Sequence, residues 1–395
     1  MRSSRIRGLL VAVFLIFVLA CAGHAKGPVA KPFLPDIPEE WTAVYPDDIY
    51  PEFEYKGLSP ACSNAPGTES DEFFFYVRGG SVNNLVVYFQ GGGACWDPIT
   101  CFTYPVFTPD CTEEDKPVNY RGMFDMADPD NPFRQWSYVF VPYCTGDVHW
   151  GANDMEYTGV QYVGGVPQII THTIQHRGFV NFQVVLKWVE EHFKKPHKIF
   201  VTGSSAGAYG ALASFPWIKE TYPKSQVYLL GDAGMGVNPP EFTEITEQSW
   251  NVQLAPWIFE TDESPGTPKV WKEVAEYYPD SKVGEFTNAW DSVQISFYNY
   301  MFQTLGLEMP PDIGMHWHMK MWEELEVKTQ APNYRYYVAD GGEHTILAKD
   351  KLYFENSAGG VYFLDWLDAM IKSQGGTRGH GAHPWDNLAC DTCME

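Results

Sequence analysis

Basic residues are scarce in this sequence of 395 residues. Lysine and arginine together number 27, against 50 aspartates and glutamates, so the formal net charge is −23. A chain with this balance repels polyanions, and we expect no nucleic-acid partner. Hydrophobic residues make up 45% of the chain and aromatic residues 16%, a composition that predicts a large folded core rather than a disordered protein.

Long apolar runs are equally rare, because only Gly8 to Ala20 forms one. Three arginines, Arg2, Arg5 and Arg7, precede it. A basic segment followed by a short apolar run is typical of a secretory signal, and this run is too short to span a bilayer comfortably. We therefore expect residues 1–25 to be a signal peptide and the rest of the chain to be soluble or merely tethered by a lipid.

Two cleavage sites are compatible with this signal. The small residues Gly23 and Ala25 favour cleavage after Ala25, whereas Val18-Leu19-Ala20-Cys21 looks like a bacterial lipoprotein signal that ends before Cys21. The second site would place a lipid anchor on Cys21. Both sites predict an extracytoplasmic protein, whether secreted, periplasmic or an outer-membrane lipoprotein.

Cysteine is uncommon too, and an exported chain uses it mainly in disulfides. The short spacing of Cys95 and Cys101 predicts a local bridge, and Cys390 and Cys393 favour a second local disulfide over a redox or metal motif. Beyond residue 25 the cysteine count is odd, so one thiol is left over if the others pair. These cysteines are Cys62, Cys95, Cys101, Cys111, Cys144, Cys390 and Cys393.

The sequence has no internal repeat and no low-complexity block. Short β-branched or aromatic runs alternate with helix-like stretches, which is the pattern of a mostly parallel sheet flanked by helices. Apolar residues at helical spacing over 178–193 predict a crossover helix. The predicted strands are 85–89, 136–142, 198–202, 226–230 and 334–339, with a further short strand at 283–287.

A region rich in proline and tryptophan, about 239–326, interrupts this alternation and predicts an inserted cap or lid beside the sheet. The last residues, 376–395, are predicted to be a tail. The aromatic residues of the cap would form its core, line an acyl pocket or stack on sugars. Among them are Trp250, Trp257, Trp271, Trp290, Trp317 and Trp322.

The clearest chemical signal is the turn Gly203-Ser204-Ser205-Ala206-Gly207. It lies between the apolar strand Ile199-Phe200-Val201 and a helix start of small residues. A serine at such a turn projects its hydroxyl above the sheet, and glycines are needed where side chains would collide with the neighbouring strand and helix. The turn predicts an α/β-hydrolase fold over 26–375 with Ser205 as nucleophile, although a structural Ser-rich turn would have the same residues.

A serine nucleophile needs a general base, and in this fold a histidine follows the last strands in the chain order Ser, acid, His. His344 fits, because it follows the strand 334–339 and a glycine turn. The pair His316 and His318 lacks a third metal ligand at useful spacing, so we expect no metal and no organic cofactor. The rival bases are His380 and His383 in the tail, and His316 and His318 in the predicted cap.

Chain order alone leaves the acid open. Asp291 follows the strand 283–287 and Asp232 follows the strand 226–230, so both lie between Ser205 and His344. Asp340 is a weaker candidate because it is only four residues from the base.

The oxyanion hole should draw one N–H from Ala206, the residue after the nucleophile. Gly92 and Gly93, in the glycine loop after the strand 85–89, are expected to supply the rest. The same glycines would also suit a tight turn with no catalytic part.

Together these segments resemble the pectin acetylesterase and Notum family of secreted carboxylesterases. Tyr88 to Cys95 resembles its glycine-rich oxyanion segment, Pro142 to Gly151 its cysteine loop, and Thr202 to Gly207 its nucleophile turn. Asp291-Ser292-Val293-Gln294 is similar to the family's acid motif, and this similarity favours Asp291 over Asp232.

The resemblance implies a serine esterase that removes acetyl or another acyl group from a glycan or other ester. Ser205, His344 and Asp291 would form its triad, and the reaction would pass through an acyl-enzyme. The expected partner is the ester substrate, acetylated polysaccharide first and a fatty-acyl ester second. The alternatives are a lipase of the same fold and a non-catalytic binding protein on a hydrolase scaffold.

Overall fold

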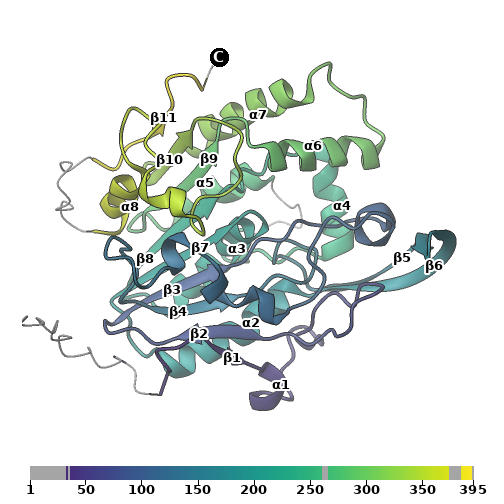
Figure 1. Ribbon diagram of the computed structural model, residues 1–395, viewed down its shortest axis with the longest axis horizontal. Helices are drawn as coiled ribbons and strands as arrows, with labels where there is room; N and C mark the ends of the chain where they lie inside the picture. Colours follow the sequence, from purple (N-terminus) through teal and green to yellow (C-terminus); the bar gives the residue numbers. More distant parts are fainter. Residues whose placement is uncertain (1–32, 34–35, 260–265, 373–383, 394–395) are drawn as a thin grey trace, which may run out of the picture. The chain divides into compact units, whose positions relative to one another are not determined.

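The computed structural model describes residues 33, 36–259, 266–372 and 384–393 (Figure 1). The predicted signal segment with Cys21, and the rival bases His380 and His383, lie outside the described residues. Within those ranges, no helix combines the length and the apolar character needed to cross a membrane.

A nine-stranded sheet forms the centre of the described chain, in the order β1-β2-β4-β3-β7-β8-β9-β10-β11. All neighbours from β4 to β11 are parallel, whereas β2 is antiparallel to β1 and β4. The predicted mostly parallel α/β sheet is therefore confirmed. The strands are β1 (Thr42–Val44), β2 (Phe75–Arg78), β3 (Asn84–Phe89), β4 (Ser137–Val141), β7 (Lys198–Ser204), β8 (Gln226–Asp232), β9 (Val283–Asn288), β10 (Tyr334–Ala339) and β11 (Leu388–Ala389).

Helices cover both faces of this sheet, which is why its central strands are apolar on both sides. Leu85, Val87 and Phe89 of β3 belong to the core under one layer of helices, while Val86 and Tyr88 belong to the core on the other face. The first layer consists of α2 (Gly178–His192), α3 (Ala206–Thr221), α5 (Thr267–Tyr277) and α7 (Ile313–Lys328). On the other face lie α8 (Phe363–Ile371) and the short 3-10 turns Gly122–Phe124 and Asp350–Tyr353.

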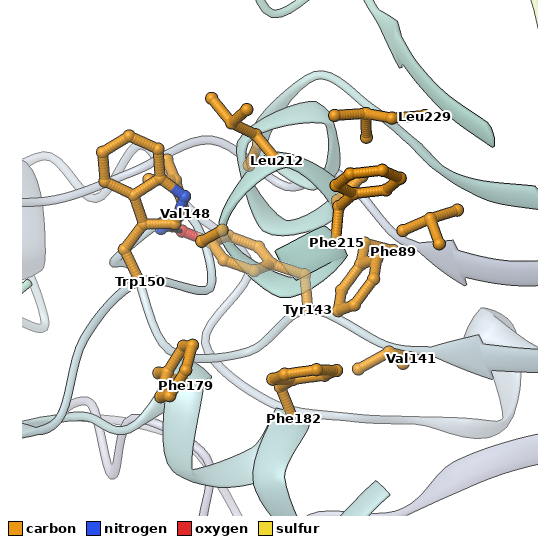
Figure 2. Packing of buried hydrophobic residues seen from close by; sticks show 14 of the residues in the cluster. Phe89, Val141, Tyr143, Val148, Trp150, Phe179, Phe182, Leu212, Phe215 and Leu229 are labelled. Carbon is orange, nitrogen blue, oxygen red and sulfur yellow. Dashed lines mark hydrogen bonds between the residues drawn. The ribbon is translucent and has the colours of Figure 1, made fainter. Parts of the chain in front are cut away.

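The packing of α2 and α3 on the sheet explains their sequences. Phe182 of α2 and Phe215 of α3 pack near Phe89 at the end of β3, and Phe179 of α2 lies next to Phe182 (Figure 2). The ring of Phe89 lies 5.8 Å from that of Phe182. The predicted crossover helix is confirmed, and its apolar face supports the strand that leads into the glycine loop.

The described residues of the region 239–326 form four helices and one strand. β9 lies inside this region and pairs with β8 and β10, so the central sheet divides the region in two. α6 and α7 lie side by side after β9 (Figure 1). The helices are α4 (Pro240–Trp250), α5, α6 (Ser292–Leu305) and α7. The assignment of a catalytic domain at 26–375, a cap at 239–326 and a tail at 376–395 stays a prediction, and Leu388 and Ala389 of that tail form β11.

An antiparallel hairpin, β5 (Asn153–Val163) and β6 (Val166–His176), projects from the sheet and was not predicted (Figure 1). Gly164 and Gly165 form its turn, both with positive φ, which is the usual signal of a two-residue hairpin. The remaining short elements are α1 (Pro46–Ile49), the π-helical turn Ile99–Thr103 and the 3-10 turns Glu113–Asp115 and Pro117–Asn119.

Three disulfides form among the described cysteines. The predicted bridges Cys95–Cys101 and Cys390–Cys393 are confirmed. The third, Cys62–Cys144, joins residues 82 positions apart and was not predicted. Cys111 is the free thiol that the odd count required.

Candidate active site

Ser205 occupies a sharp turn between β7 and α3. Its φ of 57° and ψ of −125° are unusual for a residue with a side chain, and such backbone strain persists only where the surroundings hold it. The Ser205 N–H donates to the carbonyl of Asp232, 2.7 Å away on the neighbouring strand. This geometry is the one expected of a nucleophile turn.

The glycine that closes this turn is required by space. A Cβ on Gly207 would lie 1.9 Å from the carbonyl oxygen of Phe89, so any side chain there would force α3 away from β3. The predicted reason for the flanking glycines therefore holds in the fold.

A hydrogen-bonded contact between His344 and Asp291 joins two separate loops. The His344 Nδ1 lies 2.8 Å and 3.0 Å from the two carboxylate oxygens of Asp291. Asp291 is fully buried, whereas the His344 side chain is 17% exposed. The other ring nitrogen, Nε2, has no hydrogen-bond partner among the described residues.

The carboxylate of Asp291 is held from its other side by the start of α6. The backbone N–H groups of Val293 and Gln294 donate to it at 3.1 Å and 3.0 Å, and so does the Gln294 side chain at 3.0 Å. Asp291 is therefore the N-cap residue of α6, and the donors at the helix start fix the orientation of its side chain. The glutamine of the predicted acid motif thus orients the acid directly.

The rival residues have other partners. The carboxylate of Asp232 accepts bonds from Ser204 and from the backbone after His344, not from a histidine ring. Both ring nitrogens of His318 are hydrogen-bonded, Nδ1 with the Ala289 carbonyl and Nε2 with the Trp322 indole N–H. His316 Nδ1 contacts the Tyr298 hydroxyl. Among the described candidates, only His344 contacts a carboxylate at the edge of the sheet next to Ser205.

The glycine loop approaches the nucleophile turn closely. A Cβ on Gly91 would lie 2.4 Å from the Ser204 carbonyl oxygen and 2.8 Å from the Ser205 Cβ. Gly93 and Ala206 line the same cavity as Ser205 and His344. Gly92 is not among the residues that line it, and its carbonyl accepts a bond from the Thr108 N–H. Two of the three predicted oxyanion donors, Gly93 and Ala206, thus line the cavity, and Gly92 does not.

The cavity at Ser205 has a volume of about 100 Å³ and largely apolar walls. Trp250 and Trp317 of the predicted cap line it, whereas Trp271 is fully buried in the core and Trp290 stacks on His318. Sequence reasoning missed other wall residues that come from the nucleophile helix, the cysteine loop, α4 and α6. These are Val148, Trp150, Tyr209, Phe242, Phe297 and Met301.

Comparison with known proteins addresses this arrangement from a separate direction. The profile of the pectinacetylesterase family matches residues 67–255. The palmitoleoyl-protein carboxylesterase Notum of Schmidtea mediterranea is 24% identical over 162 residues, and pectin acetylesterase 11 of Arabidopsis thaliana is 27% identical over 169 residues. These matches support the resemblance of this chain to the pectin acetylesterase/Notum family.

These matches cover 38% and 42% of this chain but only 28% and 40% of the two relatives, so less than half of either relative is matched. The Wnt deacylase Notum from Drosophila superposes with a TM-score of 0.51 at 15% identity, covering 79% of this chain and 92% of that one. This likeness supports an α/β-hydrolase-like fold for this chain. The family profile ends at residue 255, before Asp291 and His344, so those two residues rest on geometry and on the acid motif.

Proposed function

We propose that this protein is a carboxylic-ester hydrolase that uses Ser205 as nucleophile, His344 as general base and Asp291 as the orienting acid. One observation carries the proposal: Asp291 fixes the imidazole of His344 at Nδ1, while Nε2 has no hydrogen-bond partner in the described part of the chain and His344 lines the same cavity as Ser205. An Nδ1–H that donates to a carboxylate leaves a free lone pair on Nε2, which is the tautomer a general base requires.

In the proposed reaction the Ser205 hydroxyl adds to the ester carbonyl while His344 Nε2 takes its proton. The tetrahedral oxyanion receives N–H groups from Ala206 and Gly93, and its collapse expels the alcohol, which takes the proton back from His344. Water, activated by the same imidazole, then hydrolyses the acyl-enzyme and restores Ser205. Asp291 stabilises the imidazolium in both halves of the reaction.

The size of the cavity favours a short acyl group. An apolar cavity of ~150 Å³ holds one benzene molecule, so about 100 Å³ suits acetyl better than a fatty-acyl chain. The proposed substrate is therefore an acetyl ester, with acetylated polysaccharide as the first candidate from the family resemblance. A fatty-acyl ester is the alternative, and it would require the walls formed by α4 and α6 to open.

The test of the nucleophile compares Ser205 with a second serine, on the helix that follows it. Ser205→Ala should lower kcat for p-nitrophenyl acetate by about 10⁴- to 10⁶-fold, because the covalent step is lost. Ser214→Ala is the matched control: Ser214 is a fully buried serine on the same helix whose hydroxyl has no partner among the described residues. Retention of wild-type activity by Ser205→Ala would remove the proposal, as would lack of labelling of the wild type by a fluorophosphonate.

The acyl group is tested with p-nitrophenyl esters from acetate to palmitate. We expect kcat/KM to be highest for acetate and to fall steadily as the chain outgrows the cavity. A maximum at long chains would favour the fatty-acyl alternative. We also propose an extracytoplasmic location, since three disulfides are typical of oxidising compartments.

A further inference from the structure

Asp232 is a fully buried carboxylate that the proposed mechanism does not use. It ends β8, and its register partner on β7 is Ser204, the residue before the proposed nucleophile. A buried carboxylate is costly unless several donors satisfy it, so its partners indicate what it is there to hold.

The carboxylate binds the loop that carries His344. Its two oxygens accept the Ile346 N–H at 3.0 Å, and Oδ2 also accepts the Leu347 N–H at 2.9 Å. Between His344 and Ile346 stands Thr345, whose φ of 66° is a conformation that β-branched residues rarely adopt. The bonds from Asp232 hold the backbone just beyond this unfavourable residue, two positions after the imidazole.

Asp232 also binds the nucleophile turn, by two routes. Its main-chain carbonyl accepts the N–H of Ser205 at 2.7 Å, and its Oδ2 accepts the Ser204 hydroxyl at 2.6 Å. Ser204 in turn accepts a bond from the buried Tyr88 hydroxyl at 2.8 Å, and Tyr88 belongs to the strand that runs into the glycine loop. One aspartate therefore connects the segments of the proposed nucleophile and base, and through Ser204 reaches the strand before the oxyanion loop.

The other side of the His344 loop has separate anchors. Gly341 and Gly342 accept backbone bonds from Trp290 and Ser292, and the Glu343 carbonyl accepts the Asn288 side chain at 2.7 Å. These contacts tie the residues before His344 to the loop that carries Asp291. Asp232 binds the residues after His344, and through its own contacts with Ser204 and Ser205 it connects the loop to the nucleophile turn.

We propose that Asp232 is a positioning residue that sets the placement of the His344 imidazole relative to the Ser205 hydroxyl. This inference rests on the proposed function. It differs from the role of a triad acid, because both carboxylate oxygens of Asp232 bind Ser204 and backbone N–H groups while His344 Nδ1 binds Asp291. Burial raises the pKa of the Asp232 carboxyl, and the bonds from Ser204, Leu347 and Ile346 act in the opposite direction, as expected of an acceptor built for these donors.

Asp232→Asn tests the proposal at nearly constant side-chain size. The amide replaces one acceptor oxygen by an NH₂ group, so one end of the side chain faces donors that it cannot satisfy. Because a displacement of ~1 Å of a catalytic group can cost about 10²-fold, we expect kcat for p-nitrophenyl acetate to fall about 10²-fold with KM changed less than about threefold. Active sites are counted by complete fluorophosphonate labelling, so that kcat refers to folded enzyme only.

Two further variants keep the test decisive. Asp368 is another buried carboxylate; it lies on α8 and pairs with Lys372. Asp368→Asn should lower the melting temperature, while kcat per labelled site stays at the wild-type value. Ser204→Ala removes one donor to Asp232 and should give a smaller loss of kcat, about tenfold. This variant replaces Asp232→Asn in the test if Asp232→Asn does not fold.

The proposal is overturned if kcat per labelled site of Asp232→Asn, or of Ser204→Ala where the former is insoluble, stays within twofold of the wild type. It is equally overturned if Asp368→Asn loses as much kcat, since the effect would then be a general response to weakened packing. Neither result bears on the nucleophile, because the proposed function fails on a separate observation, activity retained by Ser205→Ala.

Discussion

Histidines occupy two contrasting regions of this molecule. In the cysteine loop and at the base of the β5–β6 hairpin, His149 and His176 are sealed in the core, whereas His344 lies in a loop at the cavity. His176 donates from Nδ1 to the Thr145 carbonyl and accepts at Nε2 from the Tyr157 hydroxyl. His149 binds the Gln90 carbonyl through Nε2 and packs where Gly210 of α3 leaves room for its ring.

The hydrogen-bond partners of these histidines distinguish a structural role from a chemical one. A sealed histidine with its polar atoms bonded to neutral groups is a neutral packing residue, and burial lowers the pKa of both His149 and His176 to about 4. His344 instead has a carboxylate at Nδ1, and its Nε2 has no hydrogen-bond partner among the described residues. A histidine with that pairing, beside a strained serine, is arranged for proton transfer.

The largest expected effect comes from removing the feature that distinguishes His344. Asp291→Asn keeps the bulk of the acid but no longer fixes the imidazole with Nδ1 protonated, and we expect kcat to fall by about 10⁴-fold, as this substitution does in a serine-protease triad. The measurement is p-nitrophenyl acetate hydrolysis per labelled site. Asp312→Asn is the control, because Asp312 also caps a helix of the same region, α7, but lies outside the cavity lining.

A loss for Asp291→Asn no larger than for Asp312→Asn would mean that the carboxylate contact does not distinguish His344 from the sealed histidines. If Asp232→Asn proved the more damaging of the two aspartate variants, the acid would have to be reassigned to the end of β8.

How far this site could be predicted depends on how local each signal is. Ser205 and Gly207 belong to the same turn, and the glycine is needed there because α3 passes close to the backbone of β3. This pattern is local, so the sequence alone predicts the fold class and the proposed nucleophile. Asp291 and His344 are 53 residues apart, and only a resemblance separated Asp291 from Asp232. The reason Asp232 is not paired with the imidazole, its bonds to Ile346 and Leu347, exists only in three dimensions.

Other features were out of reach for similar reasons. The cavity walls come from several helices and loops, so no window of sequence contains them. The β5–β6 hairpin is mostly half-buried or exposed, and it does not match the buried apolar runs typical of the central strands, although Gly164 and Gly165 marked its turn. Cys62–Cys144 closes too long a segment for spacing to predict it, unlike Cys95–Cys101.

A second, smaller effect concerns the sealed histidines and is visible in stability. The folded pKa of each is about 4, against an ordinary value of ~6.5, so the unfolded chain binds protons that the folded chain does not. The part of the unfolding free energy that comes from these neutral histidines is fully present above pH ~6.5. It is lost as the pH falls toward 4, and the loss is about 3 kcal/mol for each histidine. Urea unfolding at pH 7, 6 and 5 measures this slope.

The comparison must be made between variants, because Asp147 in the same loop has a pKa raised by burial and shifts the stability in the opposite direction. His176→Gln should lose stability at pH 7 but show a flatter decline on acidification than the wild type. His197→Gln, which removes an exposed histidine, should leave the slope unchanged. Equal slopes in all three proteins would show that His176 titrates normally and is not sealed.

The smallest expected effect is a change in stability when the disulfide Cys62–Cys144, which anchors the loop of His149, is altered. Cys144 stands in the loop of His149, and the free Cys111 lies 3.5 Å from Cys62, sulfur to sulfur. In Cys144→Ser refolded with glutathione disulfide, we therefore expect Cys62 to pair with Cys111, found by peptide mapping, at a cost of about 1 kcal/mol or less. The double variant Cys111→Ser/Cys144→Ser has no such partner and should lose the ~2–5 kcal/mol typical of a removed disulfide. Equal stability losses in the two variants would mean that a bridge to Cys111 cannot replace the one to Cys144, and that the loop of His149 depends on its own covalent tie.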